Sequence, residues 1–289
     1  MAWPLATLPA MPDDTPASTI AFIGGGNMAT ALIGGLVRAG RAPASILVID
    51  PGADQRARLQ ADFGVLVQPA ADAALAGAGL VVWAVKPQLF AQAAAPCAAH
   101  LRSALHLSVM AGIRSDSIAR AMGQPAATAR IVRSMPNTPA LIGRGIAGLY
   151  ATPAVTATER GQIEQVLAPT GQTLWVEQEA DLDAVTALSG SGPAYVFYWV
   201  EAMVAAAQQM GLSAEQGKRL ALATFDGATA LAAQSPEPPS VLRERVTSKG
   251  GTTFAALEAM RGDGVDQAII RAVRAAQRRA AELGDEFGA

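Results

Sequence analysis

The chain has 289 residues, of which 51% are hydrophobic and only 16% are charged, and its formal net charge is −2. An average soluble domain carries about 25% charged residues, so this apolar composition excludes a disordered chain. The near-neutral charge gives no electrostatic reason to expect a nucleic-acid partner. Either a membrane or a second subunit must therefore cover the surplus apolar surface.

Several features of the sequence argue against a membrane protein. A spanning helix needs about 20 consecutive apolar residues, and the most apolar runs, at 80–85 and 194–200, are much shorter. Segment 1–18 contains four prolines and no basic stretch, so we expect a disordered lead-in rather than a secretory signal. One cysteine and two histidines offer no basis for a disulfide or a metal site. We expect a cytoplasmic protein.

The first half of the chain alternates apolar strands with helices, which is the pattern of a parallel sheet with crossover helices. The predicted strands are 19–23, 46–49, 65–67, 80–85, 105–109 and 129–134, followed by two edge strands at 145–150 and 172–176. The predicted helices among them are 27–39, 54–63 and 156–167.

From about residue 180 onward the strand pattern ends and only helices are predicted. They cover 182–188, 193–210, 213–234, 241–246, 252–261 and 263–284. The segment 194–210 is apolar on nearly every side, and a helix without a polar face is a buried one. In so small a helical region, a partner subunit is the expected cover, so we expect the monomer to be unstable on its own.

The first motif is IAFIGGGNMA at 20–29, a G-x-G-x-x-A pattern between a strand and a helix. Gly24 permits the tight turn, and Gly26 leaves room for a pyrophosphate beside the backbone. Asn27 and Met28 begin the helix, whose free amides and dipole would hold the phosphates. The pattern predicts a Rossmann-type dinucleotide site, and a glycine-rich turn without a ligand is the alternative.

Asp50 follows the second predicted strand, where the adenosine ribose of a dinucleotide would lie. A carboxylate there accepts a hydrogen bond from the ribose 2′-OH and repels a 2′-phosphate, which favours NADH. Arg56 and Arg58 are close enough in sequence to offer a phosphate contact, so NADPH stays open. The alternative is that Asp50 is only a helix cap or turn residue.

Two further loops follow strands at the same predicted edge, and in an open parallel sheet such loops line the ligand crevice. The first is expected on the cofactor side and consists of Ala84, Val85, Lys86 and Pro87. Lys86 could instead be an ordinary solvated lysine. The second loop, MPNTP at 135–139, is stiffened by two prolines. Asn137 is expected to bind the nicotinamide end, unless this loop is a rigid connector only.

A second motif, VTSKGGTT at 246–253, joins two predicted helices. Two glycines, small hydroxyls and the start of a helix make a nest of backbone amides that suits a substrate carboxylate. The two threonines could instead serve only to cap the helix.

Together these residues resemble the pyrroline-5-carboxylate reductase family, and the resemblance covers about residues 19–284. The matching segments are FIGGGNMA at 22–29, AVKPQ at 84–88, RSMPNTPALIGRGI at 133–146, LSGSGPAY at 188–195 and VLRERVTSKGGTTFAAL at 241–257. The first is shared by many Rossmann proteins, whereas the last three, in this order, are specific to the family.

The resemblance implies a fold of α/β plus all-α class. An N-terminal Rossmann-type parallel sheet domain, here 19–170, would precede a C-terminal helical dimerisation domain, here 171–289, that interlocks with a second subunit. The family's dimers often assemble further, commonly as pentamers of dimers. The implied reaction is reduction of 1-pyrroline-5-carboxylate to L-proline with NADPH or NADH, by hydride transfer to the imine carbon and with no metal.

The resemblance also assigns the substrate site. By position, the substrate carboxylate would be bound by Ser248, Gly251, Thr252 and Thr253. The Thr253 hydroxyl would also reach the ring nitrogen, which makes it the catalytic candidate. Two departures from the family are Lys249, where many members have proline, and the proline-rich segment 235–239.

Two alternatives remain beside this assignment. A 3-hydroxyacid dehydrogenase of the 6-phosphogluconate type shares the architecture but relies on a lysine in the interdomain helix, and 194–210 contains none. A non-catalytic nucleotide-binding dimer is the second alternative, and the intact loop at 248–253 argues against it.

Overall fold

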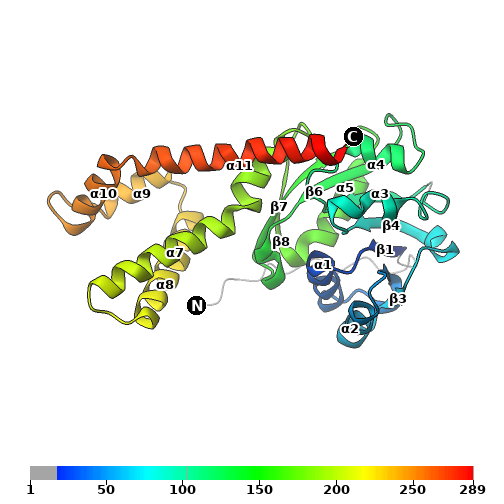
Figure 1. Cartoon of the computed structure of the whole chain (residues 1–289), viewed down its shortest axis with the longest axis horizontal. Coiled ribbons are helices and arrows are strands. Elements are labelled where there is room, and N and C mark those ends of the chain that lie inside the picture. Colours follow the sequence, from blue (N-terminus) through cyan, green and yellow to red (C-terminus); the bar gives the residue numbers. More distant parts are fainter. Residues whose placement is uncertain (1–17, 102, 289) are drawn as a thin grey trace.

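The computed structural model describes residues 18–101 and 103–288, so the predicted disordered lead-in lies outside the described residues except for Ser18. Figure 1 shows an α/β region at one end of the molecule and long helices that extend away from it. Among the described residues, no helix combines the length and the apolar character needed to cross a bilayer.

One eight-stranded sheet forms the α/β region, with the strand order β3-β2-β1-β4-β5-β6-β7-β8. The strands are β1 (Thr19–Ile23), β2 (Ile46–Ile49), β3 (Leu66–Gln68), β4 (Ala78–Trp83), β5 (Leu105–Ser108), β6 (Ile131–Met135), β7 (Gly145–Ala151) and β8 (Gly171–Trp175). All eight predicted strands are confirmed. The prediction of β7 as an edge strand is wrong, because β7 lies between β6, to which it is antiparallel, and β8.

The central strands β1, β2, β4 and β5 are buried on both faces because their side chains alternate between two apolar cores. In β4, Leu80 and Val82 belong to one core, whereas Val81 and Trp83 belong to the other. This double burial explains why the strand is a continuous apolar run in the sequence. The strand order reverses between β1 and β4, and such a switch point is where open α/β sheets bind ligands.

Helices cover both faces of the sheet. The first core includes side chains from α1 (Asn27–Arg38), α2 (Ala53–Phe63) and α5 (Ala157–Leu167), and the second includes side chains from α3 (Phe90–Ala94) and α4 (Ser115–Ala121). The sequence predicted α1, α2 and α5 but missed α3 and α4, which are only 5 and 7 residues long. Segments this short do not complete an amphipathic pattern.

The remainder of the described chain is helical. It contains α6 (Asp181–Val185), a π-helical turn η6 (Thr186–Gly190), α7 (Gly192–Gln209), α8 (Ala214–Gln234), α9 (Pro239–Arg245), α10 (Thr252–Gly262) and α11 (Val265–Gly288). The single helix predicted at 182–188 is therefore two different segments. The sheet continues through β8, and the domain division at 170/171 stays a prediction.

The helices from α7 to α11 leave the sheet and return to it. α7 and α8 pack together, and α11 runs back along the molecule until its C-terminal end lies beside α4 (Figure 1). An ion pair holds that end in place, with Arg114 Nη2 lying 2.5 Å from Asp285 Oδ1.

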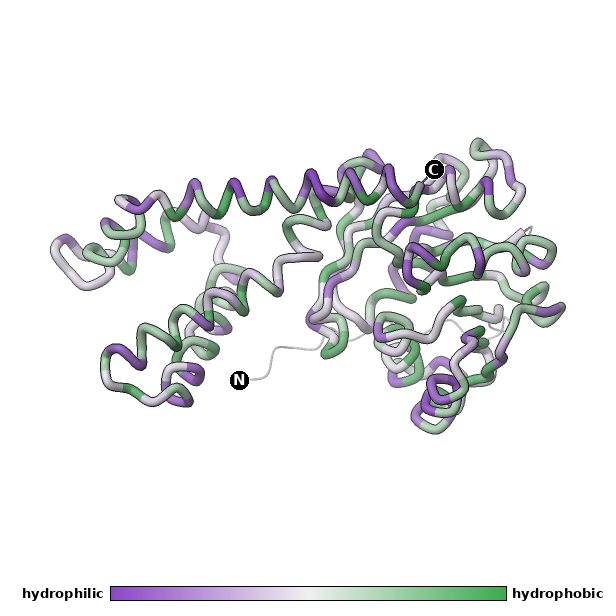
Figure 2. Tube along the Cα trace, in the orientation of Figure 1, coloured by the Kyte–Doolittle hydropathy of each residue, from purple (hydrophilic) through white to green (hydrophobic). Residues whose placement is uncertain are grey.

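Large apolar side chains are exposed along this helical region, and Figure 2 shows apolar positions recurring on α7 and α8. In the single chain α7 buries only Ala207 of its 18 residues. Phe197 and Tyr198 are 62% and 74% exposed. Exposed large apolar side chains in this number mark an interaction site. The predicted location of the surplus apolar surface is therefore confirmed.

Candidate cofactor and substrate sites

The turn between β1 and α1 has the geometry of an anion site. Gly24 has φ +96°, and a Cβ there would lie 2.7 Å from the carbonyl oxygen of Ala84, so only glycine fits. Gly26 is the N-cap of α1 without a side-chain cap, and a Cβ on it would meet nothing within 4 Å. Asn27 and Met28 form the first turn, whose backbone amides face this open space. The turn therefore fits a dinucleotide pyrophosphate.

Asp50 is hydrogen-bonded to this turn. Its Oδ2 accepts from the Gly25 amide at 2.7 Å, and its Oδ1 accepts from the Gly52 amide at 2.8 Å. The carbonyl of Gly25 accepts from Gln55 Nε2 at 2.5 Å and from the Thr30 hydroxyl at 3.2 Å. Asp50 is thus both a turn residue and a brace for the glycine-rich loop. Sequence reasoning missed Gln55, which no local pattern distinguishes.

The two candidate arginines differ in placement. Arg56 donates from Nη1 to the carbonyl oxygen of Asp50 at 2.7 Å, which holds its guanidinium at the end of β2. Arg58 instead forms an exposed ion pair with Asp62, 3.5 Å from Nε to Oδ2. Of the two, Arg56 is therefore the one that contacts Asp50, through its backbone carbonyl.

The loop after β4 packs against the glycine-rich turn. The amide of Ala84 donates to the Ile23 carbonyl at 2.8 Å, and a Cβ on Gly24 would lie 2.9 Å from Val85 Cγ1. Lys86 is exposed at the start of the short helical turn η3 (Pro87–Leu89). The predicted cofactor loops are therefore adjacent in space.

Asn137 lies in the loop after β6, at the same edge of the sheet. Its Oδ1 accepts from the Ile146 amide at 3.0 Å, and its Nδ2 donates to the Ser189 carbonyl at 3.2 Å. These two bonds occupy the acceptor and one of the two amide hydrogens, so one hydrogen stays available. Contact between Asn137 and a nicotinamide stays a prediction.

The loop between α9 and α10 is shaped as a nest. Gly250 has φ +74°, and the Gly251 amide donates to the Ser248 carbonyl at 3.0 Å. A Cβ on Gly251 would lie 2.5 Å from Ser248 Oγ, so the Ser248 hydroxyl can keep its position only if residue 251 is glycine. Gly251 caps α10 without a side-chain hydrogen bond. The alternative in which Thr252 or Thr253 caps the helix is therefore wrong, and the amides of the first turn lack a side-chain partner.

The glycine-rich turn and the nest loop lie far apart within one chain. Figure 1 shows β1 and α1 within the α/β region, and α9 and α10 at the far end of the helices that extend away from it. The expectation that a cofactor and the 248–253 loop meet is therefore not fulfilled inside a single copy.

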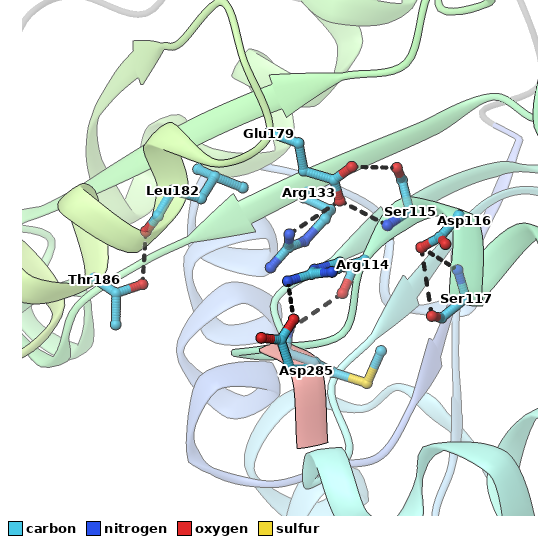
Figure 3. A network of polar contacts seen from close by, with 11 residues as sticks. Arg114, Ser115, Asp116, Ser117, Arg133, Glu179, Leu182, Thr186 and Asp285 are labelled. Carbon is cyan, nitrogen blue, oxygen red and sulfur yellow. Dashed lines mark hydrogen bonds and ion pairs between the residues drawn. The ribbon is translucent and has the colours of Figure 1, made fainter. Parts of the chain in front are cut away.

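A partly buried polar network, which sequence reasoning missed, ties the start of the helical region to the sheet (Figure 3). Arg133 is 8% exposed and donates from Nη1 to Glu179 Oε1 at 3.0 Å. The same carboxylate accepts from the Ser115 amide at 2.7 Å and from its hydroxyl at 2.6 Å. Because Glu179 and Ser115 are 64 positions apart, no local pattern could have revealed this bond.

Beside this network lies a small cavity of about 230 Å³, which Arg114, Arg133, Glu179 and Asp183 help to line. Burial raises the pKa of the Asp183 carboxyl, and the charges of Arg133 and Arg114 oppose that change. The described residues contain no group of three or more His, Cys, Asp and Glu side chains that could hold a metal ion.

Comparison with known families matches both halves of the chain. Residues 179–283 match the family described as pyrroline-5-carboxylate reductase dimerisation. Residues 19–112 match the family described as NADP oxidoreductase coenzyme F420-dependent. The chain is thus an oxidoreductase that oligomerises and acts on a small molecule.

Individual relatives extend over nearly the whole chain. A pyrroline-5-carboxylate reductase of Pseudomonas aeruginosa is 44% identical over 270 residues, covering 93% of this chain and 98% of the relative. A solved pyrroline-5-carboxylate reductase structure from Coxiella burnetii is 34% identical with a TM-score of 0.86, covering 92% of this chain and 98% of that one. A Plasmodium falciparum pyrroline carboxylate reductase with NADP bound is 26% identical with a TM-score of 0.82, covering 93% and 98%. The chain belongs to the pyrroline-5-carboxylate reductase family.

Proposed function

We propose that the chain reduces 1-pyrroline-5-carboxylate to L-proline, the final step of proline synthesis, with a nicotinamide dinucleotide as the hydride donor. The observation that carries this proposal is that the chain contains two open anion sites of different kinds. One is the glycine-rich turn before α1, and the other is the uncapped nest before α10. A location in the cytoplasm and the division into 19–170 and 171–289 belong to the same proposal.

The dinucleotide would lie along the carboxyl edge of the sheet. Gly24, Gly26 and the first turn of α1 would hold its pyrophosphate, and Asp50 with Arg56 would meet the adenosine ribose. Towards the nicotinamide the neighbours would be Ala84, Val85, Lys86 and Pro87. Asn137 would lie beside them at the same edge, with its side-chain amide bonded to Ile146 and Ser189. NADPH is supported by the NADP-bound Plasmodium relative and by Arg56, whereas Asp50 supports NADH.

The nest loop would fix the substrate by its carboxylate. Backbone amides of the first turn of α10 and the Ser248 and Thr252 hydroxyls supply hydrogen-bond donors for that group. The Thr253 hydroxyl would contact the ring nitrogen and hold it beside the reacting carbon. A protonated cyclic imine is already electrophilic, so catalysis rests on proximity and orientation of the two reactants.

A second copy of the chain would bring the two sites together. The nest loop is remote from the glycine-rich turn of its own chain (Figure 1), and α7 exposes an apolar face. We infer a homodimer in which the nest loop of one copy completes the cofactor site of the other, and a decamer is its higher assembly. Analytical ultracentrifugation measures both states.

Two variants test the shared site. Gly26→Val places a side chain where the pyrophosphate would lie, and Thr253→Ala removes the substrate hydroxyl. In a statistical mixture of both chains, heterodimers restore about a quarter of wild-type activity if each site uses two chains. If the mixture were no more active than the two variants alone, the shared site would be contradicted.

The reaction itself is tested with the wild-type protein. If the folded protein oxidised neither NADPH nor NADH when the substrate is supplied, the reaction would be rejected. The alternative of a non-catalytic nucleotide-binding dimer would then stand.

A further inference from the structure

The junction between the sheet and the helical region contains a π-helical turn. η6 (Thr186–Gly190) separates α6 from α7 and packs against α11. The Ser191 amide donates to the Thr186 carbonyl, five residues earlier, at 2.8 Å. π-helical turns are rare and frequently occur at functional sites. The turn lies between α6, which contacts β6 and β7, and α7.

The π-helical turn and the proline after it leave two carbonyl groups without their usual helical donors. The carbonyl of Ser189 would normally accept from residue 193, which is a proline and has no N–H. The carbonyl of Ala187 loses the Ser191 amide to Thr186. Buried or half-buried carbonyls need other partners.

Side chains supply both missing donors. Asn137 Nδ2 donates to the Ser189 carbonyl at 3.2 Å, and the Tyr195 hydroxyl donates to the Ala187 carbonyl at 3.1 Å. Tyr195 lies on α7 itself, whereas Asn137 comes from the cofactor edge of the sheet. The Asn137 bond therefore joins the two halves of the chain.

Close packing fixes the same contact. A Cβ on Gly190 would lie 2.6 Å from Met135 Cε, at the end of β6. A Cβ on Gly148 would lie 2.6 Å from Val185 Cγ1, on the last turn of α6. Gly148 thus lets α6 lie directly against β7, because the stiff Val185 side chain could not give way to a Cβ. At Gly190 the flexible Met135 side chain would have to move.

We propose that Asn137 is a positioning residue that sets the angle between the sheet and the helical region. Its side chain joins the start of β7, through the Ile146 amide, to the π-helical turn. Because α7 and α11 both contact that turn, the bond controls where the nest loop of one copy meets the cofactor of the other. This role rests on the proposed function and extends it to a residue that need not touch the substrate.

The test compares Asn137→Asp, Asn137→Ala and Tyr195→Phe with the wild type. Asn137→Asp keeps the acceptor for Ile146 and loses the donor to Ser189, so it isolates the bond across the junction. The expected result is a rise in KM for the substrate of about 3- to 10-fold, the factor for one neutral hydrogen bond. The Kd of the reduced dinucleotide, measured by fluorescence titration, stays within about twofold because the glycine-rich turn and Asp50 are unchanged in these variants.

Gln172→Ala is the matched control, because Gln172 is an exposed amide side chain on edge strand β8. Wild-type KM in both Asn137 variants would overturn the proposal. So would a rise in cofactor Kd equal to the rise in substrate KM, because that pattern marks direct contact with the nicotinamide. Tyr195→Phe is the second probe of the turn if an Asn137 variant fails to fold, and wild-type KM in it would count against the proposal.

Hydrogen exchange separates this proposal from the proposed reaction. Amides of residues 186–191 are expected to exchange faster in Asn137→Asp than in the wild type, whether or not the protein reduces the imine. Unchanged exchange there would overturn the role of Asn137 at the junction. An inactive wild type with the expected exchange would instead reject only the reaction.

Discussion

The carboxylate of Asp50 accepts a hydrogen bond from the amide of Gly25 at 2.7 Å, which joins the end of β2 to the glycine-rich turn. Asp50 therefore combines two roles, the ribose contact and the turn residue, which the sequence analysis gave as alternatives. The same side chain that would meet the ribose also braces the turn that would hold the pyrophosphate. A substitution at Asp50 must change both the preference between cofactors and the affinity for each.

Asp50→Ser is expected to shift preference toward NADPH, because no carboxylate remains to repel a 2′-phosphate. Its affinity for NADH is expected to fall about tenfold or more, because a charged acceptor is lost from Gly25 and from the ribose. Asp50→Asn keeps an acceptor oxygen without the charge, so it should show the shift with a smaller loss. Cofactor Kd values from fluorescence titration give both quantities. An unchanged preference would exclude Asp50 from the ribose site.

Arg56→Ala is expected to raise the Kd for NADPH about 10- to 100-fold, the effect of one charge-assisted hydrogen bond. The Kd for NADH should change little because NADH has no 2′-phosphate. Arg58→Ala is the matched control, since Arg58 is paired with Asp62 on the exposed side of α2. Equal effects of the two substitutions on NADPH would contradict the assignment.

Local chemistry explains what the sequence predicted well. Strands β1 and β2 end where predicted because fully buried strands are short apolar runs. The turn at Gly24 was predictable because a positive φ and a close carbonyl admit glycine alone. The nest at Gly250 and Gly251 follows from the same rule.

Long-range contacts explain what the sequence could not predict. The bonds of Glu179 to Ser115 and of Asn137 to Ser189 join residues more than 50 positions apart. The π-helical turn depends on the distant Asn137 as the donor to its Ser189 carbonyl, so in the sequence its residues look like an ordinary helix and loop. The distance between the two anion sites also depends on the tertiary fold, and neither motif predicts it.

Glu179→Gln is expected to destabilise the fold by about 1–3 kcal/mol, because it weakens a charge-assisted bond and leaves Arg133 buried with less compensation. Arg133 is 8% exposed, so water replaces the lost interaction only in part. Glu258→Gln is the matched control, since its ion pair with Arg261 is exposed and should contribute about 0.5 kcal/mol or less. Urea unfolding midpoints measure both. Equal shifts would show that the buried network adds nothing.

Thr253→Ala is expected to lower kcat/KM for the substrate about 10- to 100-fold, because a hydrogen bond to a charged group is lost. The Kd of the cofactor should stay near the wild-type value, since the substitution leaves the glycine-rich turn and Asp50 unchanged. Thr229→Ala is the control, because the Thr229 hydroxyl bonds to the Phe225 carbonyl within α8. If Thr253→Ala had wild-type kinetics, Thr253 would have no catalytic role.

His106 is expected to make the stability of the fold depend on pH. It is completely buried, and Trp83 Nε1 donates to its Nδ1 at 3.2 Å. Burial first, and the charge of Arg130 second, lower the pKa of His106 to about 4. In the unfolded chain the imidazole has a pKa near 6.5. Between about pH 6.5 and pH 4 the unfolded state therefore binds a proton at His106 that the folded state does not bind. Stability therefore falls as pH drops from about 6.5 to about 4, by about 3 kcal/mol in total.

The comparison of two histidine variants isolates this effect from the carboxylates that also titrate in acid. His106→Gln should flatten the loss of unfolding free energy between pH 7 and pH 5, because no buried imidazole remains to be kept neutral. His100→Gln makes the same substitution at the other histidine, which is half-buried and lies outside the sheet, and serves as the reference variant. Urea unfolding at several pH values measures each slope. If His106→Gln had the same slope as His100→Gln, the buried imidazole would not be the source of the acid sensitivity.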